Sequence, residues 1–196
     1  TVNPAFEPAY LAQASVFESR HEKGNAIAVL KRYLEQVNPR NRDIRQHLVQ
    51  LYLATKDYTG GLAELETILQ DNPGDLDAQL RMALIYGEKK EFSKAISRLT
   101  EILNAKPAEL KVRDYLGYVY EESKDFQKAI EAYRYNIQLD PKFSDSHMHL
   151  GVLLYRLKQF PEAVTHLDEA VHLVPKQPEP FIVLGLAHVQ SDQYEK

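Results

Sequence analysis

The chain has 196 residues, of which 44% are hydrophobic and 27% are charged, and its formal net charge is -4 at pH 7. This balance is typical of a folded globular protein and excludes collagen-like, low-complexity and fully disordered chains. The slightly acidic charge provides no general positive field, so we expect no nucleic-acid partner. No apolar run reaches the roughly 18 residues that a membrane helix requires, so we expect no direct membrane insertion.

The sequence contains no Cys. Disulfides, thiolate catalysis and Cys-based zinc or iron–sulfur sites are therefore excluded. The absence of Cys suits a reducing cytoplasm and an oxidising periplasm equally, so both compartments are compatible with the composition. The chain begins at Thr1 and not at Met, which we interpret as a processed form or a fragment of a longer chain.

A period of 34 residues runs through the chain. Prolines recur at this spacing at Pro39, Pro73, Pro107, Pro141 and Pro175. An aromatic column keeps the same register at Tyr58, Phe92, Phe126, Phe160 and Tyr194. Between successive prolines, apolar residues repeat at helical spacing in two separate segments, which predicts two helices in each unit. Each closing Pro is expected to stop the second helix, because the residue before a Pro disfavours helical geometry.

In chain order, the predicted units are 8–41, 42–75, 76–109, 110–143 and 144–177, followed by a partial unit at 178–196. A single helical hairpin is too short to bury a core, so neighbouring hairpins must stack. The sequence therefore predicts one all-α solenoid domain over residues 1–196. Because the partial unit supplies a first helix without a second one, we expect the natural array to continue.

Three details within the units indicate how the helices pack and begin. One column of the first helices is small, with Gly117, Gly151 and Gly185, which predicts close approach of two helix backbones. Three polar residues shortly after the closing prolines are predicted helix N-caps: Asn41, Asp75 and Ser144. Asn136 stands in a column where neighbouring units have Ile102 and Ala170.

The fourth unit carries Tyr115, Leu116, Gly117, Tyr120, Phe126, Ala129, Tyr133 and Pro141. These residues resemble the tetratricopeptide repeat (TPR), a helix-turn-helix with Leu-Gly and Tyr in the first helix, Ala and an aromatic or apolar residue in the second, and a closing Pro. The resemblance covers nearly the whole chain as five near-complete repeats and a partial one. It implies a right-handed superhelical solenoid of stacked antiparallel hairpins. The first unit departs most from the pattern, with Ala14, Ser15, Glu18 and Lys31 in signature columns.

No group of residues has the spacing of a catalytic or metal site. His147 and His149 are two residues apart, so on a helix they point in different directions. His166, Glu169 and His172 share one skewed helix edge that would hold a metal only weakly. No Gly-rich phosphate loop follows a strand. We therefore expect no catalytic residues, no metal and no cofactor, and we interpret the chain as non-enzymatic.

The first helices from the third unit onward are apolar on nearly every side. The face turned away from the hairpin partner carries Leu80, Leu84, Asp114, Tyr118, Met148, Val152, Tyr155, Ile182 and Leu186. A face that met only water would be polar, so this pattern predicts burial or a binding surface. In the TPR family, the first helices line a concave groove where peptides or helices of partner proteins dock. The resemblance therefore implies that these residues contact a protein or peptide partner.

One TPR subclass grips the C-terminal carboxylate of chaperones through Lys, Asn and Arg. In this chain those columns contain Ala12, Val16, Gln46, Gln50, Leu80 and Leu84, which argues against that subclass. The favoured hypothesis is a scaffold that binds a partner peptide or helix. The alternatives are a homo-oligomeric assembly module that uses the same surface, and the accessory region of a larger protein with a catalytic or anchoring part.

Overall fold

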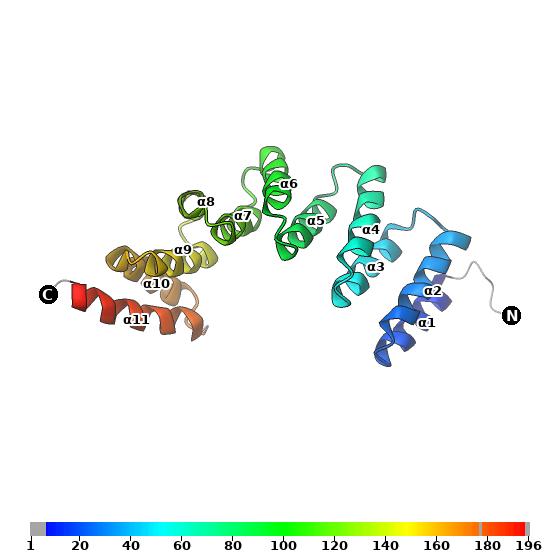
Figure 1. Ribbon diagram of the computed structural model, residues 1–196, viewed down its shortest axis with the longest axis horizontal. Helices are drawn as coiled ribbons and strands as arrows, with labels where there is room; N and C mark the ends of the chain where they lie inside the picture. The colour runs from blue at the N-terminus through cyan, green and yellow to red at the C-terminus, as the bar shows by residue number, and fades with distance from the viewer. Residues whose placement is uncertain (1–6, 177, 195–196) are drawn as a thin grey trace. The chain divides into compact units, whose positions relative to one another are not determined.

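The structure is a computed structural model that describes residues 7–176 and 178–194. These residues form eleven helices and no strand (Figure 1). The first helices of the repeats are α1 (Glu7–Ser19), α3 (Arg42–Ala54), α5 (Leu76–Glu88), α7 (Leu110–Glu122), α9 (Ser144–Arg156) and α11 (Pro178–Tyr194). The second helices are α2 (Lys23–Gln36), α4 (Tyr58–Asp71), α6 (Phe92–Ala105), α8 (Phe126–Leu139) and α10 (Phe160–Leu173). The predicted all-α, helix-turn-helix organisation is confirmed.

The chain divides into two compact units, Thr1–Lys89 and Lys90–Lys196. The boundary falls between α5 and α6, inside the third predicted repeat. In the first unit, each helix from α1 to α5 packs against the next one. In the second unit the same holds from α6 to α11, and α9 also contacts both α7 and α11. The first helices α7, α9 and α11 are therefore consecutive neighbours within the second unit.

The turn inside each hairpin contains one residue with a left-handed backbone. Lys56, Lys90, Lys124 and Lys158 have φ angles between 58° and 66°, and His21 has the same conformation. Two residues after each of these lysines, the next helix begins with the aromatic residue of the repeat. A side chain in this region of backbone space costs about 1 kcal/mol or more, so the packing of the hairpin must offset that cost.

The helix N-caps follow the closing prolines at a fixed distance. Asn41 and Asp75 each lie two residues after a Pro, and their side chains accept hydrogen bonds from Ile44 and Ala78 backbone N–H groups at 3.0 and 3.1 Å. The prediction is confirmed for these two residues. It is wrong for Ser144, because the equivalent position two residues after Pro141 is Phe143. Ser144 is instead the first residue of α9.

The small column of the first helices allows close contact with the second helix of the same repeat. A Cβ atom at Gly117 would lie 2.5 Å from Tyr133 Cε1, and one at Gly151 would lie 2.6 Å from Leu167 Cγ. Both distances are too short for real carbon atoms, so the prediction of close helix approach is confirmed there. At Gly185, a Cβ would meet no atom of the described residues within 4 Å, so this part of α11 is uncovered.

A polar side chain near the start of four first helices bonds back to the closing Pro of the preceding repeat. The nitrogen of the side chain lies 2.6 to 3.1 Å from the Pro carbonyl oxygen, six residues earlier in the chain. The four pairs are Arg45 with Pro39, Gln79 with Pro73, Arg113 with Pro107, and His147 with Pro141. Each bond ties a helix start to the end of the helix before it.

Candidate functional site

The predicted partner-binding residues of the second unit divide into exposed and half-buried groups. Tyr118, Ile182 and Leu186 are 45%, 63% and 50% exposed, respectively. Met148, Val152 and Tyr155 are half-buried. These six residues come from the consecutive helices α7, α9 and α11, and we call them the first-helix face. Leu80 is half-buried and Leu84 is exposed, and both lie on α5 in the other unit.

Two tyrosines of the first-helix face are fixed by neighbouring rings. Tyr118 stacks on Tyr115 with ring centroids 5.8 Å apart. Tyr155 contacts Phe160 at the start of α10, with ring centroids 5.7 Å apart. Each of the two tyrosine rings is therefore held against an aromatic ring of its own repeat.

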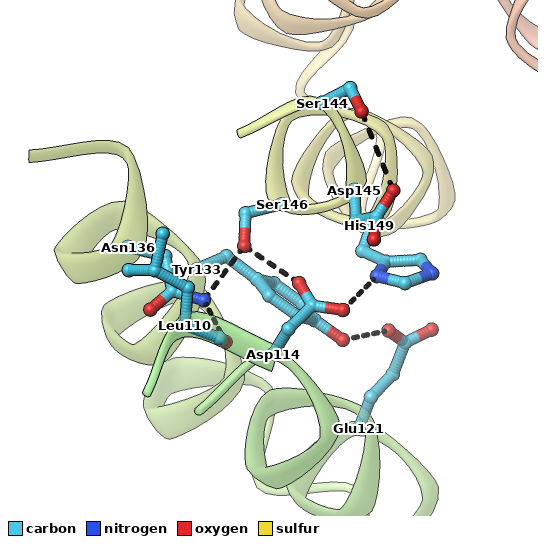
Figure 2. Close-up of polar contacts among 9 residues, drawn as sticks. All are labelled: Leu110, Asp114, Glu121, Tyr133, Asn136, Ser144, Asp145, Ser146 and His149. Carbon is cyan, nitrogen blue, oxygen red and sulfur yellow. Dashed lines mark hydrogen bonds and ion pairs between the residues drawn. The ribbon is translucent and has the colours of Figure 1, made fainter. Parts of the chain in front are cut away.

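Asp114, which the sequence assigns to the same face, lies instead in the junction between α7 and α9. Its side chain is buried, with 8% of the residue exposed. Figure 2 shows that the carboxylate bonds to two residues of α9: Oδ1 accepts from Ser146 Oγ at 2.6 Å, and Oδ2 lies 2.9 Å from His149 Nδ1. Both oxygens are engaged within the protein. Asp114 therefore joins two of the three helices that carry the first-helix face.

Asn136 extends this junction to α8. Its Nδ2 donates to the Leu110 carbonyl oxygen at 2.8 Å and to Ser146 Oγ at 3.0 Å (Figure 2). Ser146 Oγ therefore accepts from Asn136 and donates to Asp114, so the side chain connects three helices. Asn136 is fully buried, and these bonds satisfy its Nδ2, whereas its Oδ1 has no hydrogen-bond partner among the described residues.

A second set of polar contacts is centred on Glu121 at the end of α7. Its carboxylate forms an ion pair with Arg156 of α9, and Tyr133 OH of α8 donates to Oε2 at 3.5 Å. Burial raises the pKa of Glu121, while the charges of Arg156 and His149 oppose the rise. Burial and the nearby carboxylates of Glu121 and Asp114 raise the pKa of Tyr133, so its hydroxyl stays protonated and can donate.

His149 is the titratable residue that joins α9 to α7. Burial acts to lower its pKa, but the hydrogen bond and negative charge of Asp114 raise it overall, with help from Asp145 and Glu121. Its ring also lies beside Tyr133, with centroids 5.6 Å apart. The acidic surroundings of His149 therefore favour the protonated imidazole at this junction.

The amino-acid pattern alone did not identify Glu121, Ser146 and His149 as members of this junction. One signal was present: Ser146 occupies the column of Ile44, Ala78 and Val112, which are all buried apolar residues. A hydroxyl at such a position needs a hydrogen-bond partner. The Ser146 hydroxyl, together with Asn136 in another apolar column, indicates a buried polar contact between neighbouring repeats.

The histidines considered for metal binding make other contacts. His166 Nδ1 lies 3.2 Å from His147 Nδ1, and its Nε2 lies 3.8 Å from Glu162. Burial and the neighbouring His147 lower the pKa of His166. Across residues 7–176 and 178–194, no three His, Asp or Glu side chains come together in a metal-binding arrangement. Over the same part of the chain, no helix combines the length and apolar character needed to cross a bilayer.

The repeated hairpins, the aromatic turn column and the small first-helix column define an all-α repeat protein of the helical-hairpin class. Two sequence profiles described as Tetratricopeptide repeat match residues 54–114 and 116–178, respectively. Together they span more than half of the chain, so the chain belongs to the tetratricopeptide repeat family. Among curated proteins, no sequence matches this chain.

Solved structures share the fold at low sequence identity. MamA from Desulfovibrio magneticus RS-1 has a TM-score of 0.72 and 21% identity, over 89% of this chain and 97% of that one. YrrB, described as a TPR protein with an unusual peptide-binding site, has a TM-score of 0.64 and 16% identity, over 91% and 92% of the two chains. A tetratricopeptide repeat protein from Parabacteroides merdae ATCC 43184 has a TM-score of 0.76 and 13% identity, over 94% and 73%.

Proposed function

We propose that this chain is a non-enzymatic scaffold that binds an apolar segment of a partner protein on the first-helix face. The observation that carries the proposal is the exposure of Tyr118, Ile182 and Leu186 on helices of one compact unit. Large apolar side chains gathered on one face are typical of protein interaction sites. Restrained aromatic residues such as Tyr118 and Tyr155 are favourable anchors for a partner.

The chemistry of the face favours an extended peptide or a helix with apolar side chains. Met148 and Val152 are half-buried and lie on α9, which contacts both α7 and α11. We include Leu80 and Leu84 as a separate contact region on the first unit, and Asp114 as a positioning residue. YrrB, which shares the fold, is described as having a peptide-binding site, and this supports a peptide ligand by analogy.

Self-association is the second candidate, and one observation favours it. On α11, Phe181 and Val189 are also exposed, and Gly185 has no neighbour in the position where Gly117 and Gly151 meet a second helix. A second copy of the chain that covers this surface would bury the same kinds of side chain as a repeat does internally. The experiment below separates this possibility from a different partner.

Photo-crosslinking tests both candidates. We replace Tyr118 by p-benzoylphenylalanine, irradiate the protein in lysate of the source organism, and identify the adducts by mass spectrometry. The matched control carries the same group at Leu139, which is similarly exposed but lies on a second helix. Adducts with one other protein, found at position 118 and not at 139, are the expected result.

Two results would contradict the scaffold proposal. Adducts of the chain with itself, together with a molar mass by light scattering that rises with concentration, would establish the assembly module instead. Equal labelling at positions 118 and 139 would show that the first-helix face has no preferred partner.

A further inference from the structure

Arg45 and Arg113 occupy the same column of the repeat, 68 residues apart, and begin with the same contact. In each case Nη2 donates to the carbonyl oxygen of the preceding closing Pro at 2.6 Å. This shared bond holds both guanidinium groups in the same way relative to their own repeats. The two sites can therefore be compared atom by atom.

The sites differ at the other terminal nitrogen, Nη1. Arg45 Nη1 forms an ion pair with Glu64 on the second helix of its repeat, and both side chains are largely buried. Arg113 Nη1 is also buried, but it has no hydrogen-bond partner among the residues that the structure describes. The column of Glu64 contains Ala132 in the repeat of Arg113. The fourth repeat thus keeps the arginine and lacks its carboxylate.

A cavity of about 250 Å³, widely open to the surface, lies at the Arg113 site and is lined by residues of α7 and α8. Its lining consists of Arg113, Leu116, Tyr120, Lys128, Glu131, Ala132 and Tyr135. The other charged groups have partners of their own: Lys128 Nζ lies 2.7 Å from Asp125, and Glu131 Oε1 accepts from Gln127 at 2.9 Å. Tyr135 covers the guanidinium, whose Cζ lies 4.2 Å from the ring centroid.

We propose that this cavity is a carboxylate-binding site, in which an acid group of a ligand occupies the place that Glu64 fills in the second repeat. The half-exposed Tyr135 ring, which covers the guanidinium, would move aside, so that the carboxylate could accept from Arg113 Nη1 while the Leu116 and Ala132 side chains contact the carbon chain behind it. A buried N–H group without an acceptor is costly, and a carboxylate suits a guanidinium because the two groups match in geometry. Partial burial lowers the pKa of Arg113, and the nearby Tyr135 acts in the opposite direction.

This site is separate from the first-helix face, because second-helix residues of α8 form one of its walls. It also lies outside the columns through which one TPR subclass holds a chaperone carboxylate. Either proposal can therefore fail while the other holds. The carboxylate has two possible sources, a small free acid and an acidic side chain of a peptide, and the experiment distinguishes them.

The test follows the Nε–Hε signal of the Arg113 side chain by NMR, assigned by its loss in Arg113→Lys. Sodium acetate is titrated at constant ionic strength, with sodium chloride as the reference and inorganic phosphate as a second anion. The expected result is a saturable shift with acetate that exceeds the shift with phosphate. No shift beyond the chloride reference, or a response to phosphate alone, would overturn the proposal.

Two blocked peptides then separate the sources: acetyl-Ala-Glu-Ala-amide and its Gln counterpart. A tighter response to the Glu peptide than to acetate assigns the site to acidic side chains of a peptide. An equal response assigns it to small free acids. Both results support carboxylate binding, whereas an equal shift with the Gln peptide would overturn it.

The two arginine columns provide matched variants. Ala132→Glu restores the internal carboxylate, so we expect loss of the acetate shift at Arg113 and a higher melting temperature. Glu64→Ala creates the equivalent vacancy, so we expect the Arg45 signal to become sensitive to acetate. Glu131→Gln tests whether Glu131 pairs with Arg113 in solution. An acetate response that appears only in Glu131→Gln, and not in the unmodified protein, would overturn the proposal.

Discussion

Asp114 on α7 and His149 on α9 meet across 35 residues of chain, with 2.9 Å between Oδ2 and Nδ1. This contact joins two of the helices that carry the first-helix face. Because one partner is a histidine, the strength of the Asp114–His149 contact depends on pH. Acidic side chains surround the imidazole, with Asp114 and Glu121 on α7 and Asp145 on α9, while Arg156 pairs with Glu121.

Replacement of His149 by Gln is predicted to destabilise the protein more at acidic pH than at alkaline pH. Asp114 raises the pKa of His149 above the ordinary value of 6.5, so its stabilising contribution is complete below that pH and disappears as the pH rises through the folded pKa. Solvent screening limits the difference between pH 6 and pH 8.5 to about 0.5–1 kcal/mol. Urea unfolding of both proteins at the two pH values measures it.

The pH dependence of stability must be compared between the unmodified protein and His149→Gln, because His166 also titrates. Burial lowers the pKa of His166, so its contribution has the opposite sign and decreases as the pH falls. The difference between the unmodified protein and His149→Gln removes the His166 contribution. His172→Gln, at an exposed position, is the control. The same loss at both pH values would show that the Asp114–His149 pair does not titrate.

Asn136→Ala is predicted to reduce the free energy of unfolding by about 1–3 kcal/mol, because it leaves the buried Ser146 hydroxyl without its donor and removes a bond to the part-buried Leu110 carbonyl. Urea denaturation followed by circular dichroism measures the loss. Gln138→Ala, at an exposed position of the same helix, should stay within about 0.5 kcal/mol. A cycle with Ser146→Ala should be non-additive, and simple additivity would indicate that the Asn136–Ser146 bond contributes nothing.

Gly117→Ala and Gly185→Ala should have opposite effects on stability. At Gly117 the new methyl group would press on Tyr133, and we expect a loss of about 1–3 kcal/mol from overpacking. At Gly185 the space is open, so the gain in helix propensity, about 1 kcal/mol, should dominate. Thermal unfolding of both variants provides the comparison. A stabilised Gly117→Ala would mean that α7 and α8 can separate at little cost.

Lys124→Gly is predicted to stabilise the protein by about 0.5–1 kcal/mol, because Lys124 has a φ of 66° that glycine adopts without strain. The matched control is Lys31→Gly in the middle of α2, where the same change should destabilise by about 1 kcal/mol. Melting temperatures measure both effects. If both variants lose stability equally, the left-handed turn is not strained by its lysine.

The sequence was sufficient to predict the helices and the repeat register, because Pro spacing and apolar periodicity are local signals. Gly117 and Gly151 were predictable for the same reason. The buried position of Asp114 was not predictable, because helical periodicity places a residue on a helix face but does not specify which groups its side chain bonds to. Its partners Ser146 and His149 come from a different repeat. Ser144 was misassigned because composition suggested a cap, whereas the distance from Pro141 determines which residue takes that place.

The bond from a first helix to the preceding Pro carbonyl has a consequence for how this chain can diverge. Arg45, Gln79, Arg113 and His147 differ in charge and shape, yet each supplies a nitrogen at a suitable distance from the oxygen. The bond requires a side chain long enough to bring a nitrogen to the Pro carbonyl oxygen, and it does not require one particular residue type. Such a joint therefore tolerates a change of residue type while the backbone is kept. At Phe181 the column holds a side chain with no donor, so α11 starts without this joint.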